Sequence, residues 1–270
     1  MQTIGFLLRE VDGVRYYVCA AFERHDGVRH GFSTRQGGVS LPPEGALNLG
    51  FVAWDAPANV EENRRRFLAA LGIRPEFLTT VAQTHSAEFH IINAGSDQWN
   101  PRTPGDALVT VEKDVALAVK TADCFPILIS DARTGAIAAV HAGWRGILGG
   151  VLTNTLAGMR REHACSPSEL IVAVGPGIRG CCFEVGPEVE SAFRSAFPKV
   201  ELSTPHPQHP GKFMVDLPRA LQQQLAGAGV PAANAFDLGL CTGCRTDEFF
   251  SYRTEGARAG RLMAVIYRSD

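Results

Sequence analysis

Three residues of this chain combine side chains that are typical ligands of transition metals. His85 lies in Val-Ala-Gln-Thr-His-Ser, Cys124 in Thr-Ala-Asp-Cys-Phe-Pro, and His141 in Ala-Val-His-Ala-Gly-Trp-Arg-Gly. Two imidazoles and one thiolate suit zinc or copper, and three protein ligands leave the fourth position of a tetrahedron open. Because an open position distinguishes a catalytic zinc from a structural one, these residues are candidate metal ligands and catalytic residues.

Each candidate ligand lies beside a short apolar segment that reads as a strand. The segments are Phe77–Val81 before His85, Val115–Val119 and Phe125–Ile129 on either side of the turn Thr121–Cys124, and Ala136–Val140 before His141. Side chains at strand ends can converge in a crevice at the edge of a sheet. This placement favours one shared site. The alternative is two hydrogen-bonded structural histidines and one buried cysteine.

The other elements alternate in type along the chain. Helical patterns cover Asn59–Leu71, a segment from Gly143 to about Arg161, Pro187–Phe197 and Leu217–Ala226, and further strands are expected at Ile171–Val174 and Arg261–Tyr267. Short apolar strands between helices indicate a sheet covered on both faces. The two strands within Val115–Ile129 share only a short turn and therefore cannot be parallel, which predicts a mixed sheet. No linker interrupts the chain, so residues 1–270 are expected to form a single α+β domain.

Composition narrows the class of protein. The 270 residues are 45% hydrophobic with a net charge of −2 and no block of like charges, which argues against a nucleic-acid or membrane partner. The N-terminal residues lack the pattern of a signal peptide, and no apolar run approaches the length of a membrane span. Seven cysteines are an odd number, most simply free thiols or ligands in a reducing compartment. We therefore expect a cytoplasmic protein.

Two further cysteine motifs are less informative than Cys124. Cys241-Thr-Gly-Cys244 is a single C-x-x-C without a second pair or histidines at zinc-finger spacing, and adjacent cysteines such as Cys181 and Cys182 seldom pair with each other. We predict that Cys241 and Cys244 are packed thiols and not a second metal site.

Several polar residues are candidates for binding a substrate. Arg145 lies at the start of the helix after His141, where the helix dipole disfavours a cation, so it is expected to have a carboxylate or phosphate partner. Ser33, Arg35 and Asn48 lie in or after the glycine-rich segment 31–40, which reads either as a substrate loop or as a β-hairpin with a Gly-Gly turn.

Taken together, these segments resemble one family. The motifs are Gly-Phe-Ser-Thr-Arg-x-Gly-Gly-Val-Ser, Asn-Leu-Gly, Glu-Asn-Arg at Glu62–Arg64, Gln-x-His, Gly-Asp-Ala, Thr-Ala-Asp-Cys-x-Pro, Ala-Val-His-Ala-Gly-Trp-Arg-Gly, Gly-Pro-Gly-Ile, Cys-Thr-x-x-Cys and Phe-Phe-Ser-Tyr-Arg. From about Gly31 to Ile266 the chain resembles YfiH-like proteins, also called the laccase-domain or polyphenol oxidoreductase family, whose members are now regarded as purine nucleoside phosphorylases. The chain departs from the family pattern at Ser86 and Thr254, neither of which is a presumed ligand.

The resemblance implies an α/β sandwich with mixed β-sheets and a zinc site at His85, Cys124 and His141. It also implies phosphorolysis of adenosine, inosine and 5′-methylthioadenosine, together with adenosine deaminase activity. Zinc lowers the pKa of bound water to about 7, which suits deamination at C6 of adenine. For phosphorolysis, Arg145, Arg64 or Arg35 could hold the phosphate.

Two other classes of enzyme stay open. A cysteine hydrolase would use Cys124 as nucleophile and His141 as base, and a peptidoglycan-precursor editing amidase would be of this kind or a zinc variant. A copper-dependent polyphenol oxidase would use the same His₂Cys set, but four-electron reduction of oxygen normally needs several coppers, and the sequence supplies one convincing set.

Overall fold

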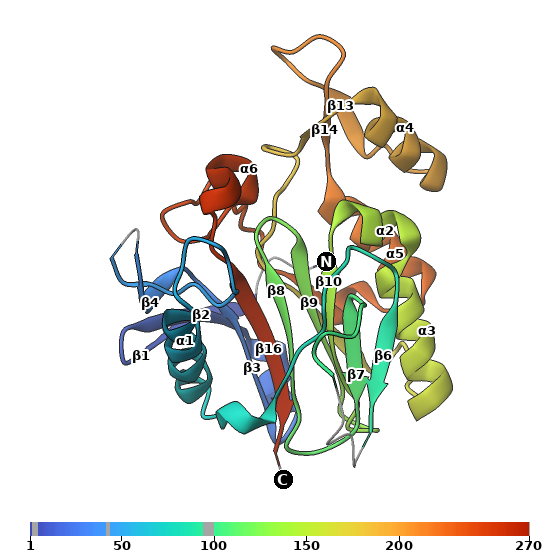
Figure 1. The fold of residues 1–270 in the computed structure, drawn as a ribbon. Coiled ribbons are helices and arrows are strands. Elements are labelled where there is room, and N and C mark those ends of the chain that lie inside the picture. The colour runs from blue at the N-terminus through green and yellow to red at the C-terminus, as the bar shows by residue number, and fades with distance from the viewer. Residues whose placement is uncertain (2–4, 42–43, 94–99, 270) are drawn as a thin grey trace.

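Two β-sheets packed face to face form the centre of the protein, with helices on the outer faces (Figure 1). The structure is a computed structural model that describes residues 1, 5–41, 44–93 and 100–269. Within these residues, no helix has the length and apolar character needed to cross a membrane.

The sheets draw their strands from distant parts of the chain. The first sheet has six strands in the order β1 (Phe6–Val11), β2 (Val14–Cys19), β3 (Val28–Ser33), β16 (Leu262–Arg268), β8 (Ala116–Thr121) and β5 (Leu78–Thr79). The second has six in the order β15 (Ala235–Asp237), β11 (Leu170–Val174), β9 (Phe125–Asp131), β10 (Ile137–Ala142), β7 (Ala107–Thr110) and β6 (Phe89–Ile92). A third, small sheet has the order β12 (Glu184–Val185), β14 (Phe213–Val215) and β13 (Ser203–Pro205).

Both large sheets are mixed, which confirms the expected α+β sandwich. The pairs β5–β8, β6–β7 and β11–β15 are parallel, whereas β8–β16, β9–β10 and β9–β11 are antiparallel. The reasoning from Val115–Ile129 was nevertheless wrong, because β8 and β9 do not pair with each other. They belong to different sheets, and the turn that contains Cys124 carries the chain from one sheet to the other.

One hydrophobic core lies between the two sheets. Side chains of β8 and β16 meet side chains of β7, β9, β10 and β11, and the fully buried members include Leu117, Val119, Ala264, Ile266, Leu108, Leu128, Ile137 and Ala139. These strands read as nearly continuous apolar runs because each sheet is covered on both faces. At about 25 cal/mol per Å² of apolar surface, this burial is the dominant force that holds the sheets together.

Helices cover the outer faces. Helix α1 (Pro57–Ala70) begins at a proline in its first position and packs Phe67 and Leu68 against the first sheet. Helix α3 (Val151–His163) packs Leu152, Leu156 and Met159 against the second sheet, beside α5 (Leu217–Gly227).

The segment from Gly143 to Arg161, predicted as one helix, forms two. Helix α2 (Trp144–Gly149) ends at Gly150, whose φ of 81° is left-handed, and α3 starts immediately afterwards. Glycine adopts this conformation without the steric penalty of a Cβ atom, so it terminates one helix and redirects the chain into the next.

The remaining elements are short. They are β4 (Gln36–Ser40), α4 (Pro187–Ala196), α6 (Tyr252–Glu255) and 3₁₀ helices at Ala20–Arg24, Pro75–Phe77, Ala232–Asn234 and Gly256–Arg258. Strands β13 and β14 form a hairpin of the small sheet, which projects with α4 from one end of the molecule (Figure 1).

Candidate active site

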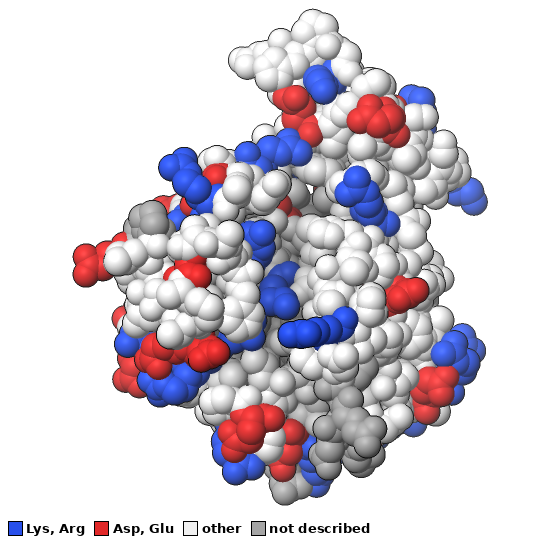
Figure 2. All heavy atoms as spheres, in the orientation of Figure 1, with Lys and Arg blue, Asp and Glu red and all other residues white. Residues whose placement is uncertain are grey.

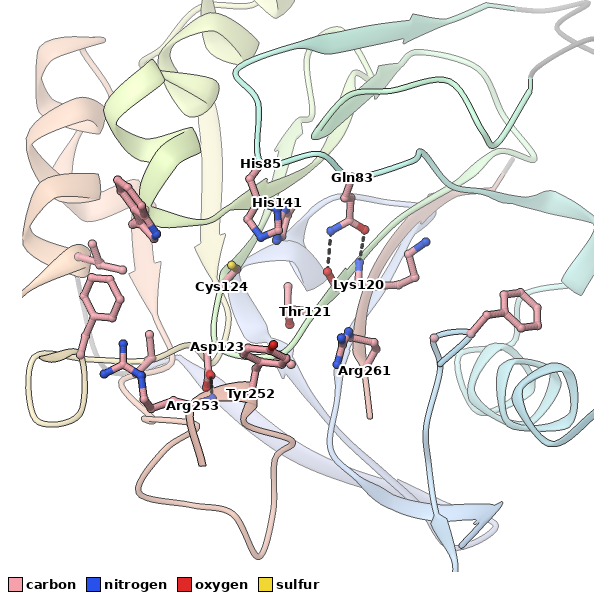
Figure 3. Close-up of a pocket in the computed structure, with 17 residues that line it drawn as sticks. Gln83, His85, Lys120, Thr121, Asp123, Cys124, His141, Tyr252, Arg253 and Arg261 are labelled. Atoms are coloured by element: carbon pink, nitrogen blue, oxygen red, sulfur yellow. Dashed lines mark hydrogen bonds between the residues drawn. The ribbon is translucent and has the colours of Figure 1, made fainter. Parts of the chain in front are cut away.

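His85, Cys124 and His141 come together between the two sheets at one end of the sandwich. His85 lies in the loop after β5, Cys124 in the turn from β8 to β9, and His141 in β10. One nitrogen of each histidine and the sulfur of Cys124 lie within 4.8 Å of one another, and the imidazole centroids are 4.9 Å apart (Figure 3). The predicted convergence is therefore confirmed. One detail differs, since His141 is part of its strand and does not follow it.

The backbone at this cluster is tightly constrained. His85 has a φ of 60° and Asp123, next to Cys124, a φ of 84°, both in the left-handed region that few side chains adopt. A Cβ atom at Gly143 would lie 2.9 Å from Cys124 Sγ and 2.9 Å from His85 Cδ2. Glycine at position 143 therefore lets the loop after β10 pass close to two of the three side chains. Strained residues of this kind concentrate at functional sites.

A buried carboxylate, Asp106, orients the cluster. Its Oδ1 lies 2.7 Å from His141 Nδ1, and it accepts hydrogen bonds from the backbone N–H groups of His85 (3.0 Å) and Ser86 (2.6 Å) and from the Ser86 hydroxyl (2.7 Å). Asp106 thus fixes the His141 ring through Nδ1 and also holds the loop that carries His85. A carboxylate behind a histidine is the usual support of a metal-binding imidazole. Asp106 is the aspartate of the Gly-Asp-Ala motif and was not among the predicted site residues.

Cys124, His141 and Asp106 have strongly shifted pKa values. Burial raises the pKa of the Cys124 thiol, but hydrogen bonds with His141 and His85 outweigh this and lower it to about 6. Burial lowers the pKa of His141, but hydrogen bonds with Asp106 and Cys124 outweigh this and raise it to about 9. Burial likewise raises the pKa of Asp106, and the hydrogen bonds from His141 and Ser86 bring it well below its usual range. The cluster therefore favours a thiolate at Cys124, the form that binds metals and attacks electrophiles.

The cluster borders a cavity of about 560 Å³. Its lining residues are Gly50, Phe51, Gln83, His85, Lys120, Thr121, Ala122, Asp123, Cys124, His141, Trp144, Ile178, Phe183, Leu217, Tyr252, Arg253 and Arg261 (Figure 3). Lys and Arg atoms gather at a hollow on this face of the molecule (Figure 2). A pocket of this size with aromatic walls and a few polar groups is suited to a small-molecule ligand.

Gln83 links two segments of the chain that line this pocket, the loop of His85 and strand β8. Its amide donates to the Lys120 carbonyl at 2.6 Å, and its carbonyl accepts from the Lys120 N–H at 2.8 Å. This reciprocal pair joins the His85 loop to β8. Nearby, the buried Thr121 hydroxyl lines the cavity and has no hydrogen-bond partner among the described residues. Buried hydroxyls are normally paired, so Thr121 is available to a ligand.

None of the five residues predicted to bind substrate is among the lining residues. Ser33 accepts a hydrogen bond from the Met263 N–H, and Asn48 bonds to Asp55 and to the backbone of Gly50 and Arg261. Both are buried within the first sheet and its adjoining loops.

The three predicted arginines differ in their surroundings. Arg35 pairs with Glu255 at 3.0 Å, so its charge is already compensated. Arg64 donates to the Leu49 carbonyl and stacks on Phe51, and Arg145 stacks on Trp144. The two stacked rings both line the cavity, so Arg64 and Arg145 each contact a residue of its wall.

Comparison with known proteins agrees with the fold and the motifs. The model of the family described as multi-copper polyphenol oxidoreductase laccase matches residues 29–269. Purine nucleoside phosphorylase YfiH of Escherichia coli is 36% identical over 241 residues, which cover 89% of this chain and 94% of that protein. A protein named adenosine deaminase RL5, from an unknown prokaryotic organism, is 34% identical over 244 residues, which cover 88% of this chain and 93% of that protein.

A solved structure agrees over nearly its whole length. YlmD from Geobacillus stearothermophilus superposes with a TM-score of 0.88 at 32% sequence identity, covering 97% of this chain and 98% of that chain. Fold, motifs and relatives thus point the same way, and the chain belongs to the multi-copper polyphenol oxidoreductase laccase family, the YfiH-like group that its motifs resemble.

Proposed function

We propose that this protein is a zinc-dependent purine nucleoside phosphorylase. It would convert adenosine, inosine or 5′-methylthioadenosine and phosphate to the free base and the sugar 1-phosphate, with adenosine deamination as a second activity. The observation that carries the proposal is the pocket, which combines the His85–Cys124–His141 cluster with aromatic walls and uncompensated cations. The names of the relatives give the substrate class.

The aromatic lining suits a purine. Phe51, Trp144, Phe183 and Tyr252 border the cavity, and nucleobases stack on such rings. The volume of about 560 Å³ lies within the range of about 300–1,000 Å³ that is usual for small-molecule sites, which leaves room for a nucleoside.

The cations suit phosphate. Lys120 and Arg261 line the cavity, and neither has a carboxylate within salt-bridge distance in the described part of the chain. Burial, and then the charge of Arg64, lower the pKa of Lys120 to about 8. A bound anion would offset this repulsion between cations, so Lys120, together with Arg261 in the same cavity, is the phosphate-binding group that we favour. Arg145 remains a second candidate, whereas Arg35 is already paired with Glu255.

The donor set fits a catalytic zinc. Two imidazoles and a thiolate converge on one point, Asp106 orients His141, and the side that faces the cavity is left for a further ligand. When bound, zinc supplies Lewis-acid chemistry and activates water, which is what deamination requires. The protein's own contribution is to keep His141 in one tautomer through Asp106 and to offer the Thr121 hydroxyl to the substrate.

Phosphorolysis needs mainly positioning and charge. A phosphate oxygen forms a bond to the anomeric carbon of the ribose while the bond from that carbon to the base breaks, and the electron pair leaves with the base. Positive charge develops on the sugar in the transition state, so a phosphate anion held close to the anomeric carbon stabilises it. Lys120 and Arg261 would hold this anion, and the aromatic walls would hold the base.

A cysteine hydrolase is the second candidate. Asp106, His141 and Cys124 are linked in the order of an acid, a base and a nucleophile, and the lowered pKa of Cys124 favours its thiolate. In this alternative His85 would not be needed for catalysis, which separates the two mechanisms.

The direct test is product analysis on inosine with and without phosphate. We expect hypoxanthine and ribose 1-phosphate to form only when phosphate is present. Lys120→Ala should raise the KM for phosphate about tenfold or more, because a charge-assisted hydrogen bond contributes about 1.5–3 kcal/mol. Lys199→Ala, which removes an exposed lysine in the turn after α4, is the matched control and should leave this KM unchanged. Inosine that stays intact at every phosphate concentration would contradict the phosphorylase assignment.

A further inference from the structure

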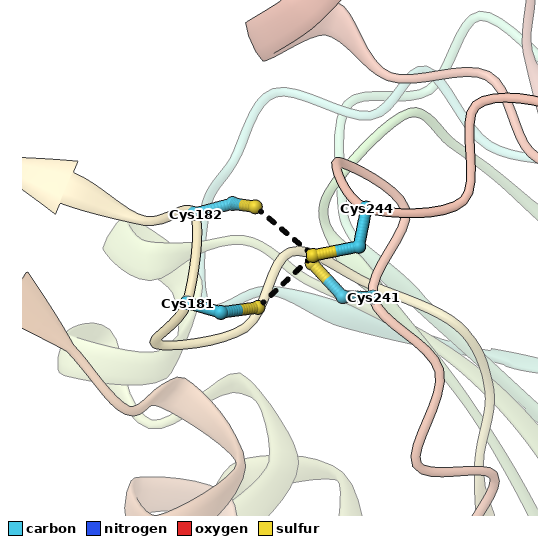
Figure 4. Close-up of side chains that lie close together, drawn as sticks. All are labelled: Cys181, Cys182, Cys241 and Cys244. Atoms are coloured by element: carbon cyan, nitrogen blue, oxygen red, sulfur yellow. Dashed lines mark hydrogen bonds between the residues drawn. The ribbon is translucent and has the colours of Figure 1, made fainter.

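Four cysteines outside the candidate active site form a second cluster. The sulfur atoms of Cys181, Cys182, Cys241 and Cys244 all lie within 4.8 Å of one another (Figure 4). Cys244 Sγ is 3.4 Å from Cys181 Sγ and 3.3 Å from Cys182 Sγ. Zinc bound by four thiolates at about 2.3 Å places neighbouring sulfurs about 3.8 Å apart, so the cluster is close to the spacing of such a site.

The prediction that Cys241 and Cys244 are not a metal site relied on the absence of partner ligands at zinc-finger spacing, but two partner thiols come from elsewhere in the chain. Cys181 and Cys182 lie in the turn between β11 and β12, whereas Cys241 and Cys244 follow β15, about 60 residues later in the sequence. Sequence spacing does not show this approach, because it arises from the parallel pairing of β11 with β15. A bridge between Gly177 and Cys241 extends that pairing into the two cysteine segments.

The surrounding backbone is arranged for close approach of these sulfurs. A Cβ atom at Gly243 would lie 3.0 Å from Cys182 Cβ and 3.1 Å from Cys182 Sγ, so the C-x-x-C turn leaves no room for a side chain there. The Arg179 N–H points at Cys241 Sγ with an N···S distance of 3.4 Å. Ligands of metal sites are commonly held in place by hydrogen bonds from neighbouring groups such as backbone N–H groups.

Ordinary packing does not account for this arrangement. Cys181 and Cys244 are exposed, so their thiols are not buried in a core, and exposed free thiols are prone to oxidation. Cys181 and Cys182 approach Cys244 almost equally, so neither is singled out as its disulfide partner. One disulfide would leave two of the four thiols without a partner. A soft dication shared by all four sulfurs leaves none of them free.

We propose that Cys181, Cys182, Cys241 and Cys244 form a second metal site, a structural zinc site with four thiolate ligands. Binding replaces the thiol protons, which pass to solvent, with bonds to the metal. Four protein ligands close the coordination shell, so this zinc has no open position for a substrate. The proposal is independent of the reaction that the protein catalyses.

The site would secure one wall of the active-site pocket. Thr242, inside the C-x-x-C turn, donates its hydroxyl proton to Asp123 Oδ1 at 2.7 Å, and the Arg253 N–H donates to Asp123 Oδ2 at 2.6 Å. Asp123 precedes Cys124 and has a left-handed φ. Phe183, next to Cys182, also lines the cavity. A metal at the four cysteines would therefore hold the turn that presents Cys124.

The first experiment measures metal content in variants that separate the two clusters. Reduced Cys124→Ala protein, in which the first cluster has lost a ligand, is loaded with cobalt(II), and its absorption spectrum is recorded. We expect about one bound cobalt with the charge-transfer and ligand-field bands of a tetrahedral tetrathiolate site. Adding Cys181→Ser and Cys244→Ser should abolish these bands. Adding Cys165→Ser instead, which removes a buried thiol outside both clusters, should leave them unchanged.

A third group of side chains provides a necessary control. Glu184, His206 and His209 also offer ligand atoms within 4.8 Å of one another. If the metal in Cys124→Ala protein is lost with His206→Ala and His209→Ala and survives the cysteine changes, the proposal is overturned. A reduced Cys124→Ala protein that binds no metal overturns it as well.

The second experiment needs no substitution and so does not depend on variants that fold. Wild-type protein is alkylated before and after treatment with a chelator, and modified cysteines are identified by peptide mass spectrometry. We expect Cys181 and Cys244 to be protected in the zinc-loaded protein and modified after chelation, despite their exposure. Modification of both at the same rate with and without zinc would overturn the proposal. So would a disulfide between any two of the four cysteines that persists in zinc-treated protein under mild reducing conditions.

Discussion

At the scale of single residues, the geometry of the candidate active site depends on the polar residues that hold His85, Cys124 and His141 in position. Asp106 touches His141 and the loop of His85 at the same time, so one carboxylate fixes two of the three presumed ligands. Cys124 in turn depends on Asp123, whose two carboxylate oxygens are held by Thr242 and Arg253. Each reactive side chain therefore has a polar residue behind it that sets its position.

His85 distinguishes the metal mechanism from the cysteine hydrolase. If all three residues bind zinc, His85→Ala should abolish activity about as completely as Cys124→Ala, because three ligands are the usual minimum for a catalytic zinc. In a Cys124–His141 dyad, His85→Ala would retain most of the turnover. Steady-state rates of both variants, measured with zinc content and with chelator-treated wild type, separate these outcomes. Near-normal turnover of His85→Ala together with insensitivity to chelators would rule out the zinc mechanism.

The sequence motifs predicted the reactive residues more readily than the residues that position them. His85, Cys124 and His141 have side chains whose chemistry is visible in the sequence, and their convergence is confirmed. Asp106 was not selected because an aspartate gains its role only from the His141 ring 2.7 Å away, a distance that spacing along the chain does not reveal. Lys120 was missed for a similar reason, because it sits at the end of an apolar strand and reads as the edge of that strand.

At the scale of elements, the periodicity of the sequence predicted most helices and strands but not which strands pair. The runs that became β8, β9, β10, β11 and β16 were recognised within a few residues, since buried strands are short and apolar. Periodicity cannot show that β8 and β9 lie in different sheets, because both sheets bury both faces. The break between α2 and α3 was also missed, because glycines are compatible with either a helix interior or its end.

The break at Gly150 gives a prediction for stability. An alanine at position 150 would meet no atom closer than 3.9 Å, so the cost comes from its left-handed φ of 81°. Gly150→Ala should lower the free energy of unfolding by about 1 kcal/mol. Gly227→Ala is the control, because Gly227 ends α5 with an ordinary φ and no contact within 4 Å, and it should be neutral or slightly stabilising. Urea denaturation measures the free energy of unfolding of both variants. Equal changes in the two would show that the backbone at Gly150 is not strained for alanine.

At the scale of the whole molecule, stability rests on the two sheets and on groups buried beside them. His30 in β3 is buried, accepts a hydrogen bond from the Cys19 N–H at 2.7 Å and packs against Phe22. Burial lowers the pKa of His30 from 6.5 to about 3. The folded protein therefore holds His30 neutral under conditions in which the unfolded chain would protonate it.

This difference predicts sensitivity to mild acid. Between pH values of about 6.5 and 3 the unfolded state binds the additional proton, so the free energy of unfolding falls as the pH falls below 6.5. His30 alone should contribute a loss of about 1 kcal/mol between pH 7 and pH 5.5. His30→Gln keeps an acceptor for the Cys19 N–H but does not titrate, so its urea midpoint should depend less on pH. An unchanged pH dependence in this variant would show that His30 is not the group responsible.

The position of β16 also affects how the protein can be made. This strand lies between β3 and β8, so it joins the antiparallel strands β1–β3 from the first part of the chain to a strand from the middle. During synthesis, β1–β3 and β8 can exist only as separate pieces, each with an open edge, until the ribosome has released residues 262–268. Since the turn that bears Cys124 begins at the end of β8, the reactive cluster can take its final geometry only after this last strand has been inserted.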